Sequence, residues 1–154
     1  MKIIFAFALC FTCIHLYACN KDSDVEQTNN YNNTINTDTM KLIITIGTHI
    51  FTATLYNNST AKAFEAKLPM TIKMTELNGN EKYFDLSDHL PTNASNPGTI
   101  QTGDLMLYGS NALVLFYKTF STSYYYTRLG SIENPSGLDA ALGSGNATVK
   151  FESE

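Results

Sequence analysis

The stretch GDLMLYGSNALVLFYKTFSTSYYYTRLG, residues 103–130, decides the fold of this chain. Its runs DLMLY (104–108) and ALVLFYKTF (112–120) are rich in the large apolar and aromatic residues of strands, and the GSN between them predicts a turn. YYYTRLGSI (124–132) predicts another strand directly afterwards. The stretch is apolar on both faces of these strands, so it forms either a ligand-binding surface or the middle of a sheet.

Further strands flank this stretch on both sides. LIITIGTHIFTATL (42–55) predicts a hairpin that turns at Gly47-Thr48, because two β-branched runs meet there. MTIKMTEL (70–77) and KYFDL (82–86) predict two strands around the turn NGNE, and ATVKFE (147–152) predicts the last strand. The chain therefore contains seven or eight short strands.

Two short helices interrupt the strands. In NSTAKAFEAKLP (58–69), Asn58 or Ser59 is the expected cap and Pro69 ends the helix. In NPSGLDAALGSG (134–145), Asn134 is the expected cap and Gly143 closes the helix. The pattern predicts a mainly β fold, a closed or nearly closed antiparallel barrel of about eight strands with two short helices, since closure removes exposed edges. A two-sheet sandwich is the alternative.

The first residues, MKIIFAFALCFTCIHLYAC, have the character of an export signal. Lys2 is followed by an apolar run too short to span a bilayer comfortably. The run ends in LYAC (16–19), which resembles the lipobox of bacterial lipoproteins. That resemblance implies a signal peptide over residues 1–18 and a diacylglycerol-modified Cys19 as the first residue of the mature chain. The alternative is an ordinary secretory signal with a coincidental cysteine.

The other two cysteines, Cys10 and Cys13, fall inside the signal, so the mature domain has no disulfide and no thiolate metal site. Residues 20–39 are rich in Asn, Thr and Asp, and too poor in apolar residues to fold. We therefore expect a lipid-anchored disordered tether over 19–39 and a folded domain over 40–154. The expected location is the bacterial outer membrane, on its periplasmic or cell-surface face.

The charge balance bears on possible partners. Removing Lys2 with the signal leaves nine of the ten basic residues beside fourteen acidic ones. This mild acidity argues against nucleic acid or an anionic membrane surface as a partner. Contact with the membrane would then come from the lipid on Cys19 alone.

From Leu42 to Glu152 the chain resembles the bacterial cyclophilin-like domain family. The resemblance is carried by TATLYNNSTAKAFEAKLPMT (52–71), ELNGNEKYFDL (76–86), residues 97–132 and SGLDAALGSGNATVKFE (136–152). It implies a small eight-stranded barrel with two capping helices, and it brings no established biochemical activity.

True cyclophilins are prolyl isomerases that use an arginine and a phenylalanine from an FHR-type strand. The corresponding strands here, residues 70–86, contain no arginine, and the chain has no tryptophan. Arg128 is the only arginine and lies on another strand. The usual catalytic motif is thus absent, and no catalytic residues can be assigned. The alternative function is prolyl isomerase or chaperone-like activity in which Arg128 replaces the usual arginine. His49 and His89 are too far apart in the sequence to predict a metal site, and no motif predicts a cofactor.

Strand alternation predicts which side chains of the opening stretch face outward. If Leu105, Leu107, Leu113 and Leu115 fill the barrel, the residues between them form the outer wall. The candidate ligand groove on this wall consists of Met106, Tyr108, Phe116, Tyr126 and Arg128. Aromatic stacking and cation–π contacts would suit a peptide, protein or glycan ligand.

The competing interpretation of the same residues is structural. A capping helix would cover this wall, and Arg128 would pair with Asp104 or Glu133 or stack on Tyr126.

Overall fold

The structure, a computed structural model, describes residues 40–154. The predicted signal peptide, Cys19 and the tether lie outside the described residues, so these expectations stay predictions. Eight strands form one sheet: β1 (Lys41–Ile46), β2 (His49–Leu55), β3 (Met70–Leu77), β4 (Glu81–Asp85), β6 (Asp104–Tyr108), β7 (Ala112–Phe116), β9 (Tyr126–Ile132) and β10 (Ala147–Ser153).

This sheet closes on itself as a barrel in the order β1-β10-β3-β4-β7-β6-β9-β2. The pairings are antiparallel throughout, and closure comes from β2 pairing with both β1 and β9. The predicted closed barrel is confirmed and the sandwich alternative is wrong. The predicted hairpins over 42–55, 70–86 and 104–120 are confirmed as β1–β2, β3–β4 and β6–β7, but β7 ends at Phe116 and Phe120 belongs to the separate strand β8. The strand predicted over 124–132 begins at Tyr126.

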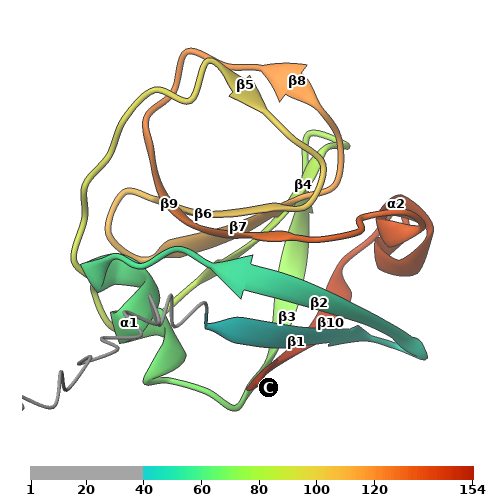
Figure 1. Ribbon diagram of the computed structural model, residues 1–154. Helices are drawn as coiled ribbons and strands as arrows, with labels where there is room; N and C mark the ends of the chain where they lie inside the picture. The colour runs from blue at the N-terminus through green and yellow to red at the C-terminus, as the bar shows by residue number, and fades with distance from the viewer. Residues whose placement is uncertain (1–39) are drawn as a thin grey trace, which may run out of the picture. The chain divides into compact units, whose positions relative to one another are not determined.

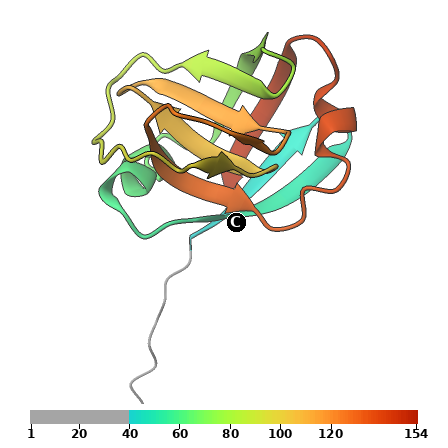
Figure 2. The ribbon, with the colours of Figure 1, turned by 90° about the horizontal axis from the view of Figure 1, so that it is seen from above.

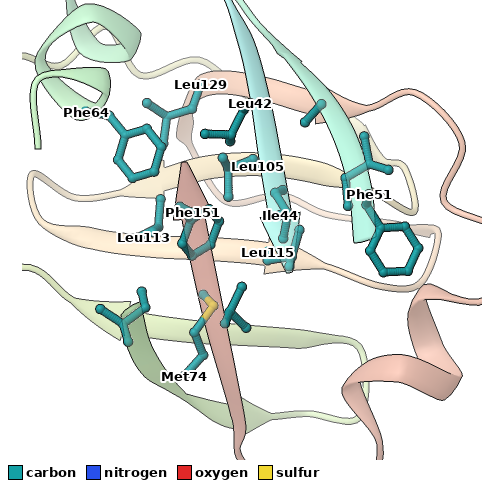
Figure 3. Close-up of a cluster of buried hydrophobic side chains, with 14 of the residues drawn as sticks. Leu42, Ile44, Phe51, Phe64, Met74, Leu105, Leu113, Leu115, Leu129 and Phe151 are labelled. Atoms are coloured by element: carbon teal, nitrogen blue, oxygen red, sulfur yellow. The ribbon is translucent and has the colours of Figure 1, made fainter. Parts of the chain in front are cut away.

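The barrel interior is filled mainly by aliphatic side chains. Leu42, Ile44 and Ile46 alternate inward along β1, as period-2 spacing requires. Figure 3 shows Leu42 and Ile44 close to Leu105 and Leu115 of the opposite wall. The four leucines predicted to fill the barrel, Leu105, Leu107, Leu113 and Leu115, are all fully buried. Each such side chain stabilises the fold by about 1.5–3 kcal/mol relative to exposure.

The two helices lie at opposite ends of the barrel in both Figure 1 and Figure 2. α1 (Ser59–Glu65) has Asn58 at its N-cap position, where Asn58 Oδ1 accepts a hydrogen bond from Ala61 N. Of the two predicted caps, Asn58 and Ser59, Asn58 is thus the one observed. The helix packs Phe64 edge-on against Phe151, with ring centroids 5.8 Å apart. This contact closes one end of the core.

The start of the second helix differs from the prediction. α2 (Leu138–Leu142) has Gly137 at its N-cap position, so Asn134 is not the cap. Asn134 Oδ1 instead accepts a hydrogen bond from Ser136 N, which builds a turn before the helix. Gly137, with φ 84°, then redirects the chain into α2. The predicted end at Gly143 is confirmed.

A small second sheet, absent from the prediction, lies outside the barrel. β5 (Thr99–Ile100) pairs with β8 (Phe120–Ser121). Figure 1 shows this pair as a separate layer over β6, β7 and β9, on the side away from β1, β2 and β10. Within residues 40–154, no helix is long and apolar enough to cross a membrane.

Candidate ligand-binding site

The outer wall under β5 and β8 is built from cross-strand neighbours on four adjacent strands. Asp85 on β4 faces Ala112 on β7, Ala112 faces Tyr108 on β6, and Tyr108 faces Tyr126 on β9. Directly opposite residues of adjacent strands point to the same face of a sheet. These four side chains therefore form one row across the outside of the barrel.

A parallel row lies two residues further along each strand. Tyr83 faces Val114, Val114 faces Met106, and Met106 faces Arg128. A third row begins with Glu81 opposite Phe116. The wall is thus carboxylate-bearing on β4, aromatic or apolar on β7 and β6, and ends on β9 with Tyr126 and Arg128.

A cavity of about 510 Å³ lies between this wall and the segment that contains β8. Its size falls in the range of roughly 300–1,000 Å³ typical of small-molecule sites. Five aromatic side chains line it: Tyr83, Tyr108, Phe120, Tyr124 and Tyr126. Its polar wall includes two carboxylates, Glu81 and Asp85, and two amides, Asn78 and Asn80.

The aromatic side chains of the wall and its cover form a connected run of rings. Tyr108 contacts both Tyr124 and Tyr126, with ring centroids 6.1 and 5.5 Å apart. Tyr126 also meets Phe116 edge-on at 5.5 Å, and Phe116 meets Phe120 at 5.8 Å. Such pairs stabilise each other by about 0.5–1.5 kcal/mol beyond the area they bury. The run holds Tyr108 and Tyr126 in fixed orientations at the cavity.

Glu81 is the most unusual group of the cavity wall. The residue is only 8% exposed, and its carboxylate forms no hydrogen bond or ion pair with residues 40–154. Burial raises the pKa of Glu81 to about 7, and the negative charge of Glu76 adds to the effect. Burial also raises the pKa of Tyr126 to about 12, with a further contribution from the charge of Glu81.

Lysine, arginine and histidine are absent from the cavity lining within residues 40–154. Acidic groups thus stand in the wall with no cation of this part of the chain beside them. Asn80 Oδ1, one residue before Glu81, is a further buried acceptor without a hydrogen-bond donor in the described part of the chain. The wall offers acceptors and aromatic faces and lacks cationic donors.

The neighbouring residue Lys82 is a buried charge whose donors all have partners, in contrast to the carboxylate of Glu81. Its side chain is fully buried and pairs with Glu76, and its Nζ donates to the carbonyls of Gly143 and Gly145 at 2.7 and 2.6 Å. Tyr117 Oη donates to Glu76 at 2.8 Å. Burial acts to raise the pKa of Glu76, but hydrogen bonds from Lys82 and Tyr117 outweigh it and hold that pKa below its ordinary value. Every charge here has partners, which Glu81 lacks.

A model of the cyclophilin-like family matches residues 44–152, most of the chain. The chain belongs to the cyclophilin-like family. The solution structure of a hypothetical protein from Archaeoglobus fulgidus is similar in fold, with a TM-score of 0.57 at 21% sequence identity, and the match covers 75% of this chain and 95% of that one. A comparison with curated proteins found no match.

The five predicted groove residues of this cyclophilin-like domain all face outward, but they do not form one open groove. Tyr108 and Tyr126 line the cavity. Met106 and Phe116 are buried with Ile100 of β5 in a second apolar cluster. Arg128 sits at the far end of its row, beyond Met106, and outside the cavity lining.

The cover over this wall comes from β5 and β8 instead of the expected helix. Of the expected partners of Arg128, Glu133 pairs with Lys41, and Asp104 Oδ2 accepts from Gln101 N at 2.9 Å. Burial raises the pKa of Asp104, and the charge of Arg128 partly offsets this effect without a direct ion pair. Within residues 40–154, Arg128 has no ion-pair partner. Three or more potential metal ligands do not gather anywhere in this range either.

The acidic part of the cavity was missed at the sequence level. In EKYFD (81–85), the first, third and fifth residues face outward, while Lys82 and Phe84 face the barrel interior. The alternation itself is visible in the sequence. Which of its two sets faces outward depends on pairing with β7, and a lysine would ordinarily be placed outside.

Proposed function

We propose that this cyclophilin-like protein is a lipid-anchored binding module of the bacterial cell envelope, which holds a peptide or glycan in the outer-wall cavity without turning it over. The observation that supports binding is the cavity of about 510 Å³ with its five aromatic side chains. Concave, mostly apolar sites with a few polar groups are the usual form of ligand sites. Lipid attachment at Cys19 would provide the membrane contact.

Binding without turnover is preferred over prolyl isomerisation because of where Arg128 lies. Isomerisation needs a donor to the prolyl nitrogen, since weakening the amide resonance is what lowers a barrier of about 18–20 kcal/mol. Among the residues described, none that lines the cavity carries a permanent positive charge, and Arg128 stands beyond Met106.

The test of binding uses the full-length protein in detergent against peptide and glycan arrays, with hits measured by calorimetry. Tyr108→Ala removes a cavity-lining ring that is 46% exposed, and Tyr125→Ala removes a neighbouring ring that is 62% exposed and outside the cavity. We expect hits whose affinity falls at least about tenfold in Tyr108→Ala and stays unchanged in Tyr125→Ala. Absence of any hit, or equal losses in both variants, contradicts the proposal.

The anchor is tested separately by labelling cells with radioactive palmitate. The wild-type chain and Cys13→Ser should carry the label, because Cys13 is removed with the signal, and Cys19→Ser should not. Label that persists in Cys19→Ser would contradict lipidation at this residue while leaving the binding proposal intact.

A further inference from the structure

Glu81 is only 8% exposed, and its carboxylate, which lines the cavity, has no hydrogen-bond or ion-pair partner within residues 40–154. On the neighbouring strands its direct opposites are Leu77 of β3 and Phe116 of β7, neither of which supplies a donor. The other buried carboxylate of the outer wall, Asp104, accepts a backbone hydrogen bond from Gln101. The Glu81 carboxylate thus faces the cavity with its acceptor positions unused by this part of the chain. A ligand in the cavity can donate to it there, where a charge-assisted hydrogen bond contributes about 1.5–3 kcal/mol.

The groups that surround Glu81 cannot supply this partner. Glu76 on β3 and Asp85 on β4 are acids. Tyr83, Tyr117 and Tyr126 are phenols, which carry no positive charge and donate no hydrogen bond to Glu81 within residues 40–154; the Tyr117 hydroxyl donates to Glu76 instead.

Lys82 follows Glu81 in sequence, but its Nζ is held on the interior side by Glu76 and the carbonyls after α2. Asn80 Oδ1 adds an acceptor without a donor. A ligand that fits this wall brings positive charge and several N–H donors.

The aromatic part of the cavity favours the same ligand chemistry. Tyr108 and Tyr126 stand in one row with Asp85, and their rings lie 5.5 Å apart. Ring faces attract guanidinium and ammonium groups, by about 0.5–2 kcal/mol per contact. A carboxylate beside tyrosine rings therefore distinguishes a basic side chain from a neutral sugar.

Building on the proposed binding function, we propose that the cavity selects a basic peptide, with a guanidinium or ammonium side chain paired to Glu81 and packed against Tyr126, whose ring meets Phe116 directly opposite Glu81. The guanidinium is the best match, because it offers five N–H donors in a planar fork and stacks on aromatic faces. The glycan alternative becomes an outcome of the test.

The probes are N-acetyl-leucyl-arginine amide and its citrulline counterpart, which has the same shape and no charge. Binding to the full-length protein in detergent is measured by calorimetry at pH 8. We expect the arginine peptide to bind at least about tenfold more tightly than the citrulline peptide, as one charge-assisted hydrogen bond of about 1.5–3 kcal/mol requires. Glu81→Gln should remove this preference, and Glu65→Gln, which removes the same charge from α1 outside the cavity, should keep it.

A second measurement needs no variant, so the proposal remains testable even if Glu81→Gln fails to fold. Arginine stays charged at all relevant pH values, so the pH dependence reports on the protein. With the pKa of Glu81 near 7, and the neutral carboxyl binding about tenfold more weakly than the carboxylate, the affinity of the wild-type protein for the arginine peptide should rise at least about sevenfold from pH 5.5 to pH 8.

Equal affinity for the two peptides, or an affinity that does not change with pH, overturns the selection of a basic group. If array ligands still bind through Tyr108 in that case, the proposed binding function stands and only its charge selectivity fails. A glycan that binds while both peptides do not would also overturn the inference. No binding by any array member removes both proposals.

Discussion

At the scale of single residues, Glu81 weakens the fold in the pH range where it is ionised. Burial, followed by the charge of Glu76, raises its pKa to about 7 from the ordinary value near 4.5. A carboxyl whose pKa is raised by folding contributes its stability fully below its unfolded pKa, and this is lost as the pH rises through 7. The unliganded protein should therefore lose stability from pH 4.5 to pH 8 through this group.

Glu81→Gln should remove this pH-dependent loss. We expect the variant to be more stable than the wild type by about 2 kcal/mol at pH 8, which discounts the full shift because the carboxylate faces the cavity, and equal to it at pH 4.5. Urea unfolding at both pH values measures the difference. Glu65→Gln serves as the control, and a stability gain of the same size at both pH values would contradict the assigned cause.

Lys82 carries the opposite expectation, because its charge is fully partnered. Lys82→Met removes three hydrogen-bond donations and leaves Glu76 and the carbonyls of Gly143 and Gly145 without them. We expect a loss of about 3 kcal/mol in urea unfolding at pH 7, as for other broken buried pairs. Lys67→Met, which breaks the more exposed pair with Asp88, should change stability much less. Equal losses of unfolding free energy in both variants would show that the hydrogen bonds of Lys82 do not stabilise the contact between β4 and the segment after α2.

At the scale of elements, the two helix starts give a matched pair of asparagines. Asn58 Oδ1 accepts from Ala61 N at 2.8 Å, and its Nδ2 donates to the carbonyl of Arg128 on β9 at 2.9 Å. Asn58→Ala should therefore cost about 1–2 kcal/mol of unfolding free energy. Asn134→Ala should cost less than about 0.5 kcal/mol, because Asn134 is exposed and caps no helix. Thermal unfolding of both variants measures the contrast, and an equal cost would contradict it.

The elements also show what the sequence reveals of the fold. The eight barrel strands contain five to eight residues each. This length is enough for the residue pattern of a strand to be recognised, so these strands can be predicted from the sequence. β5 and β8 contain two residues each, too few for a strand-like alternation of residues to be detected. They are held in place because Ile100 and Phe120 pack against Phe116 on the barrel wall. The cover of the site is thus a tertiary feature without a local signal.

The candidate site likewise combines local features, which the sequence predicts, with tertiary features, which it does not. The sequence predicts that Tyr108 and Tyr126 face outward, because alternation within a strand is local. It does not reveal that Glu81 joins them, because that requires the order β4-β7-β6-β9 in the closed barrel. Nor does it reveal that Arg128 on β9 is separated from the carboxylates of β4 by the two strands β7 and β6.

At the scale of the whole molecule, closure of the barrel depends on the contact between β2 and β9. Three residue pairs make this contact, and Leu55 faces Gly130 in the last of them. A methyl group added at Gly130 would lie 2.5 Å from the carbonyl oxygen of Thr54, a backbone atom that cannot move without shifting β2. The glycine therefore permits the close approach that closes the barrel.

Gly130→Ala should destabilise the whole domain by about 3 kcal/mol, at the upper end for overpacked sites, because strand β2 must separate from β9. Gly145→Ala is the matched control, since an added methyl group there meets nothing within 4 Å, and we expect a change within about 0.5 kcal/mol. Urea unfolding gives both values, and amide hydrogen exchange at Tyr56, whose N–H donates to Leu129 across this junction, locates the effect. Faster exchange there in Gly130→Ala than in Gly145→Ala is the expected result. A fully stable Gly130→Ala domain would mean that the barrel closes without this close approach.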